Sequence, residues 1–66
     1  MRVTAKIKDV RREVTLPNGG DVAALLDALG LPLISYIVIR GSYPIPIDET
    51  LMDGDDLILL ETFSGG

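Results

Sequence analysis

The sequence ends in Ser64-Gly65-Gly66, directly after a strand-like apolar run over 56–63. A terminal carboxylate becomes an electrophile once it is activated, and residues without a Cβ let it enter a narrow enzyme site. We therefore expect the Gly66 carboxylate to be the reactive group, with Ser64 as a polar spacer and Gly65 as part of the flexible arm. Chain ends also fray without any function, and this alternative stays open for the tail taken by itself.

The rest of the sequence offers few other reactive groups, because it contains no Cys and no His. Thiolate nucleophiles, imidazole bases and the usual zinc clusters are excluded, which leaves lysine amines, hydroxyls and carboxyls. Asp53, Asp55 and Asp56 lie in too short a loop for a calcium site of the EF-hand type. We expect no metal, no bound cofactor and no enzyme active site.

Length and charge restrict the partners. A chain of 66 residues forms one small domain, in which only about 60% of the unfolded surface becomes buried. Ten acidic against six basic residues give a net charge of −4, which disfavours nucleic acids and anionic membranes as partners. No apolar run approaches the roughly 20 residues of a membrane span, and no signal-peptide core follows the start. We expect a cytoplasmic protein.

The first half of the chain predicts a hairpin followed by a helix. Polar and apolar residues alternate over 2–8 and again over 12–16, which predicts two strands with a turn at 9–11. Asp21 is suited to cap a helix, and Gly30 is suited to end it in the left-handed conformation. Between them an apolar stripe has helical spacing: Val22, Leu25, Leu26 and Leu29.

The second half predicts three further extended segments. The apolar run 33–39 indicates a strand packed on both faces or facing a partner. Alternate prolines restrict 43–47 to an edge strand or an extended loop. A tight turn at 53–55 leads into the last strand, 56–63. We predict an α+β fold of the β-grasp (ubiquitin-like) type, in which one helix packs on one face of a mixed four- or five-stranded sheet with the last strand beside the first. Residues 1–63 form the domain and 64–66 the tail.

Three features together resemble the ThiS/MoaD family of ubiquitin-like sulfur carrier proteins. They are the order of elements, the Asp-Gly-Asp turn within 51–57, and the Gly-Gly end twelve residues after Gly54. The segment from Ile39-Arg40-Gly41 to Ile47 is also similar, although Arg40 stands where asparagine is more usual. The length is close to that of the thiamine-type members, and the archaeal small modifier proteins are a further resemblance.

The resemblance implies a carrier and not an enzyme. An ATP-dependent adenylyltransferase, related to ubiquitin-activating enzymes, would adenylate Gly66. A sulfur donor with a cysteine persulfide would then displace AMP and leave a thiocarboxylate. A downstream synthase would accept the sulfur in thiamine, molybdopterin or tRNA-thiolation biosynthesis. ATP would be used by the activating enzyme, with nothing bound to the carrier.

The last strand indicates a partner-docking surface. Its alternation places Leu57 and Leu59 toward the helix and leaves Ile58 and Leu60 on the open side of the sheet, unless the register is shifted by one or an oligomer covers them. Phe63 is expected either to anchor the tail or to insert into the partner. The carboxylates expected near this end could steer a basic partner or form a solvated face: Asp55, Asp56 and Glu61, with Asp48, Glu49 and Asp53. We expect a monomer when the protein is free.

Two other functions remain open. In ubiquitin-like conjugation an amine would attack the adenylate, and Lys6 and Lys8 are the only lysine acceptors within the chain itself. In the other, the chain is a β-grasp binding module that is never activated. A natural tail that extends beyond Gly66 would favour this module or require processing.

Overall fold

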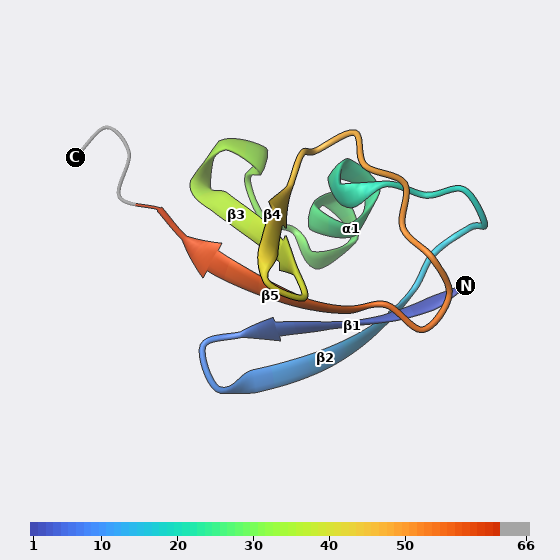
Figure 1. Ribbon diagram of the computed structural model, residues 1–66, viewed down its shortest axis with the longest axis horizontal. Helices are drawn as coiled ribbons and strands as arrows, with labels where there is room; N and C mark the ends of the chain where they lie inside the picture. Colours follow the sequence, from blue (N-terminus) through green and yellow to red (C-terminus); the bar gives the residue numbers. More distant parts are fainter. Residues whose placement is uncertain (63–66) are drawn as a thin grey trace.

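A five-stranded mixed sheet carries one helix on one of its faces in the computed structural model, which describes residues 1–62 (Figure 1). The elements in chain order are β1 (Arg2–Ile7), β2 (Val10–Thr15), α1 (Val22–Leu29), the 3₁₀ helix η1 (Leu33–Ser35), β3 (Tyr36–Arg40), β4 (Tyr43–Ile45) and β5 (Asp56–Glu61). The strand order is β2-β1-β5-β3-β4. The last strand runs parallel to β1 and antiparallel to β3. The predicted fold class is therefore confirmed, including the central place of the last strand.

The N-terminal hairpin forms as predicted, but its turn is shorter than expected. Ile7 pairs with Val10, so only two residues, Lys8 and Asp9, connect the strands. The predicted turn at 9–11 is wrong, because 10 and 11 belong to β2. The reason is register: the two-residue turn pairs Val14 with Val3 on the helix side, whereas a turn at 9–11 would place Val14 opposite a lysine. Lys8 adopts a left-handed conformation, with φ of 57°, to close this turn.

The helix begins and ends at the predicted residues. A side-chain oxygen of Asp21 accepts a hydrogen bond from the Ala24 amide at 2.9 Å, which satisfies one of the free donors of the first turn. Gly30 ends the helix in the left-handed conformation, with φ of 73°. The apolar stripe faces the sheet, with Val22, Leu25 and Leu26 buried.

Replacement of Asp21 by alanine is expected to lower the free energy of unfolding by about 1 kcal/mol, because an amide of the first turn loses its acceptor. Urea unfolding followed by circular dichroism at 222 nm would measure the change. Asp21→Asn is the control, since asparagine caps nearly as well as aspartate. Equal losses in both variants would contradict a capping role for this side chain.

The apolar run 33–39 does not form a single strand. Residues 33–35 form η1, in which the Ser35 amide donates to the Pro32 carbonyl at 3.3 Å, and β3 begins only at Tyr36. The turn carries the chain from the end of α1 back to the sheet, so the predicted strand is wrong over its first three residues. One face of β3 is buried at Val38, whereas Ile37 on the other face is 44% exposed. Of the two expectations for this run, burial on both faces is wrong.

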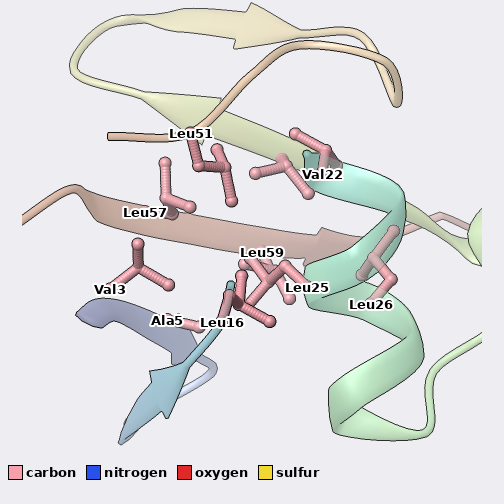
Figure 2. Packing of buried hydrophobic residues seen from close by; sticks show 10 residues of the cluster. Val3, Ala5, Leu16, Val22, Leu25, Leu26, Leu51, Leu57 and Leu59 are labelled. Carbon is pink, nitrogen blue, oxygen red and sulfur yellow. The ribbon is translucent and has the colours of Figure 1, made fainter. Parts of the chain in front are cut away.

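The core lies between the helix and one face of the sheet (Figure 2). Its residues are apolar throughout, and Leu25, Leu26 and Leu57 have no exposed surface. The buried set comprises Val3, Ala5, Leu16, Val22, Leu25, Leu26, Val38, Leu51, Leu57 and Leu59. Within residues 1–62, no helix has the length and apolar character needed to cross a membrane.

Candidate functional site

The end of β5 is held firmly before the chain reaches the tail. Glu61 pairs with Tyr36 of β3. One residue further, the Thr62 amide donates to the Ser35 carbonyl at 2.8 Å, and the Thr62 hydroxyl donates to the Ile34 carbonyl at 3.4 Å. The chain is thus fixed to η1 up to Thr62. The residues predicted to form the anchor and the tail, 63–66, lie outside the described part of the chain.

The open side of the sheet carries an apolar patch beside this end. Leu57 and Leu59 are buried against the helix, whereas Ile58 is 42% exposed and Leu60 47% exposed. The predicted register of β5 is confirmed, and the docking role of its two exposed residues stays a prediction. Ile37 of β3 pairs with Leu60 and is equally exposed. We name Ile37, Ile58 and Leu60 the open-face patch.

The sequence prediction of the patch missed Ile37. The apolar character of the run 33–39 was the available signal, because one of the two alternatives for this run was that it faces a partner. The pairing of Ile37 with Leu60 could not be obtained from the sequence, since it depends on which strand lies beside β5.

The predicted acidic cluster does not lie at the end where the tail begins. Asp55 and Asp56 lie at the start of β5 and Glu61 at its end, which separates them by roughly 17 Å at the rise of an extended strand. Three of the carboxylates also have internal partners. Asp53 accepts a hydrogen bond from the Arg2 amide at 2.7 Å, Asp55 accepts one from the Met52 amide at 2.8 Å, and Glu49 accepts one from Arg40 at 3.0 Å. The expectation of one acidic cluster near the tail is therefore wrong.

Arg40 connects the far end of the sheet to the loop that precedes β5. Its guanidinium donates to Glu49 at 3.0 Å, to the Thr50 carbonyl at 3.0 Å and to Asp55 at 2.9 Å. We name Arg40, Glu49, Thr50 and Asp55 the Arg40 clasp. The guanidinium provides the planar, forked set of donors that these three acceptors need, which a shorter asparagine could not supply. Glu49 and Asp55 are thus structural residues here.

The positive charge of Arg40 does not change over the usual range of pH. The pKa of Arg40 is raised above its ordinary value, chiefly by the hydrogen bond to Asp55, while Glu49 adds to the rise and partial burial opposes it. A raised pKa in the folded state adds stability that is present below the unfolded pKa and is lost as the pH rises through the folded value. For an arginine this window lies at strongly alkaline pH, so Arg40 stays charged wherever the protein is studied.

Replacement of Arg40 by glutamine is expected to cost about 1–2 kcal/mol of folding free energy, since two partly exposed ion pairs and a hydrogen bond are lost. Arg2→Gln is the control, because it removes the same charge and the Arg2 side chain makes no salt bridge within residues 1–62. Urea unfolding at about pH 6 and about pH 9 would compare the two variants. The difference in free energy of unfolding between the two variants should be the same at both pH values, because Arg40 stays charged at both. A difference that vanishes at pH 9 would contradict this assignment.

Solved structures show the same arrangement of strands and helix. The chain superimposes on ATBAG1, solved in complex with HSP70, with a TM-score of 0.85 and 15% identity over 97% of this chain and 41% of that chain. SAMP1 from Haloferax volcanii matches over the whole of both chains, with a TM-score of 0.77 and 20% identity. A ubiquitin-like domain of an Arabidopsis thaliana protein gives a TM-score of 0.75 at 13% identity over 92% of this chain and 76% of that domain's chain.

No protein-family model and no curated protein sequence matches this chain. At these identities the likeness to solved structures concerns the fold. The chain therefore has the ubiquitin-like β-grasp fold.

Proposed function

We propose that this chain is a ubiquitin-like sulfur carrier whose Gly66 carboxylate is adenylated and then converted to a thiocarboxylate. The observation that carries the proposal is the position of the diglycine. It follows β5, which is central in the sheet and fixed through Thr62, so that only three residues lie between the last anchored residue and Gly66. A reactive end on a short arm, attached to a small domain without Cys or His, suits a carrier better than an enzyme.

The shortness of the arm defines which surface the activating enzyme must contact. Four extended residues reach at most about 14 Å beyond Thr62. The adenylating site must therefore come close to the end of β5, and the enzyme surface around it must cover the neighbouring part of the sheet. The open-face patch lies within this area, which supports docking through Ile58 and Leu60.

The chemistry requires three displacement steps. A carboxylate oxygen of Gly66 attacks the α-phosphate of ATP and releases pyrophosphate, which gives an acyl adenylate with AMP as a good leaving group. The terminal sulfur of a cysteine persulfide attacks the carbonyl carbon and expels AMP. A second thiol of the sulfur-donating machinery cleaves the acyl disulfide, forms a disulfide with the first cysteine and leaves the thiocarboxylate on the carrier. This use of ATP and reduced thiols suits a cytoplasmic protein.

Intact-mass measurement tests the proposal. The mass of the untreated protein first establishes whether Gly66 is its last residue. The protein is then incubated with ATP, inorganic sulfide and each ubiquitin-activating-like adenylyltransferase of the source organism. A mass gain equal to the exchange of one oxygen for one sulfur, located to Gly66 by fragmentation, would support the carrier. Absence of both adenylate and thiocarboxylate with every enzyme would favour the binding module.

Conjugation is the second candidate, because it uses the same activated carboxylate. In this case a lysine amine of a target protein attacks the adenylate and an isopeptide bond forms. The same incubation, repeated with cell extract in place of sulfide, would then give products that retain their added mass after boiling in detergent and thiol. Sulfur transfer alone gives no such products.

A further inference from the structure

The basic residues of this acidic protein are concentrated at the end where the tail begins. Four of its six Lys and Arg residues lie within 6–12, in the hairpin of β1 and β2, and all four are exposed: Lys6, Lys8, Arg11 and Arg12. Since β1 and β5 are parallel and Ile7 lies opposite Leu59, the hairpin turn and the end of β5 lie at the same end of the sheet (Figure 1). The end of β5 therefore lies beside four basic residues and two acidic ones, Asp9 and Glu61, so this end carries an excess of positive charge.

Strand pairing arranges the open face in rows. In the row nearest the start of β5, Thr4 is flanked by the carboxylates of Glu13 and Asp56. The next row toward the tail consists of Arg11, Lys6, Ile58 and Ile39, and the row after it pairs Leu60 with Ile37. The face thus changes from acidic to basic and apolar as it approaches the tail.

Lys6 and Arg11 are available to a partner. Together with Gly41, Asp56 and Ile58, they line a shallow depression of about 370 Å³ on the open face. Within residues 1–62 the salt bridges are those of Arg40, and neither Lys6 nor Arg11 takes part in one. Asp56 is the one acidic residue in this lining, against two cations that form no salt bridge within the described residues. Such a surface, with exposed aliphatic side chains beside it, fits a partner that supplies both carboxylates and apolar groups.

We infer that the open face receives an acidic and aliphatic surface of the activating enzyme, whose carboxylates meet Lys6 and Arg11 and whose apolar side chains cover the open-face patch. This inference rests on the proposed function, and it reverses the charge that the sequence led us to expect for the partner. A protein surface fits better than a nucleic acid, because the open-face patch needs apolar contacts and the chain as a whole carries a charge of −4.

Arg11→Glu and Arg12→Glu form the decisive pair of variants. They are adjacent in β2 and change the net charge equally. Arg11 pairs with Lys6 on the open face, whereas Arg12 pairs with the buried Ala5 and so lies on the opposite face. Steady-state rates of thiocarboxylate formation would be measured at about 0.05 M and about 0.5 M ionic strength.

For Arg11→Glu we expect KM for the carrier to rise about tenfold at low ionic strength and less than about threefold at high ionic strength, with kcat unchanged, because screening weakens the lost attraction. Lys6→Glu should behave in the same way. Arg12→Glu should stay within about twofold of the unmodified protein. Equal effects of the two arginine variants, or no effect of Arg11→Glu, would overturn the inference.

Binding without chemistry separates this inference from the proposed function. Association of the carrier with the immobilised adenylyltransferase, without ATP, is measured by surface plasmon resonance. If the enzyme binds but does not activate the carrier, the proposed function fails, and the comparison of Arg11→Glu with Arg12→Glu still decides the inference. A second copy of the chain could occupy the open face instead, and sedimentation of the carrier alone tests this alternative. A dimer that Arg11→Glu dissociates would assign the face to the second copy and overturn the assignment to the enzyme.

Discussion

Alanine at position 66 is expected to slow thiocarboxylate formation by at least about a hundredfold while leaving the domain folded. In the proposed function the last residue must bring its carboxylate into line with the α-phosphate of ATP inside a narrow site. A Cβ at this position displaces the reacting carbon, and a displacement of about 1 Å from the reactive geometry can cost about a hundredfold in rate. The measurement is single-turnover adenylate formation, with thermal unfolding to verify the fold.

Ser64→Ala is the matched control for the tail. It changes a residue of the same short arm but leaves both glycines in place, and we assign Ser64 the role of a spacer. Its rate should stay within about threefold of the unmodified protein, since a spacer contributes no interaction specific to the transition state. If Gly66→Ala were activated at the normal rate, the terminal carboxylate would not be the reactive group that we propose.

Replacement of Leu57 by alanine is expected to remove about 2–5 kcal/mol of folding free energy. The side chain has no exposed surface and belongs to the core, where it lies near Leu51 and Val3 (Figure 2). The substitution loses the free energy gained by removing these apolar atoms from water, and it also leaves a cavity in the core. At about 0.05–0.15 kcal/mol per residue, a domain of this size is stable by only about 3–10 kcal/mol. Urea unfolding should show a markedly lower midpoint for this variant.

Ile58→Ala is the control for this prediction, because it shortens an aliphatic side chain at the next position of the same strand. Ile58 points to the open face, so its loss should cost about 1 kcal/mol or less. The same variant should weaken association with the activating enzyme, whereas its fold stays intact. Similar destabilisation by the two substitutions would mean that both faces of β5 are buried, contrary to the observed exposure.

Much of the fold could be predicted because its signals are local. The cap at Asp21, the left-handed Gly30 and the apolar stripe between them define α1 without reference to any other element. The two faces of β5 follow from the alternation of a strand. The predictions were wrong where contacts between distant residues determine the structure. Packing against the core fixes the register of the hairpin. The run 33–39 is divided into η1 and β3 because the chain must turn back from the helix to the sheet.

The sequence by itself determined the apolar residues that form the core and the exposed pair Ile58 and Leu60, and it is the basis on which we propose Gly66 as the reactive end. Only the tertiary structure shows which charged side chains lie around the end of β5. Asp55 and Asp56 are close to the tail in the chain but lie at the opposite end of β5, because an extended strand rises about 3.3 Å per residue. Lys6 and Arg11 are about fifty residues distant, yet the parallel pairing of β1 with β5 places them beside Ile58. Residues far apart in the sequence become neighbours here because β5, near the end of the chain, pairs with β1, near its start.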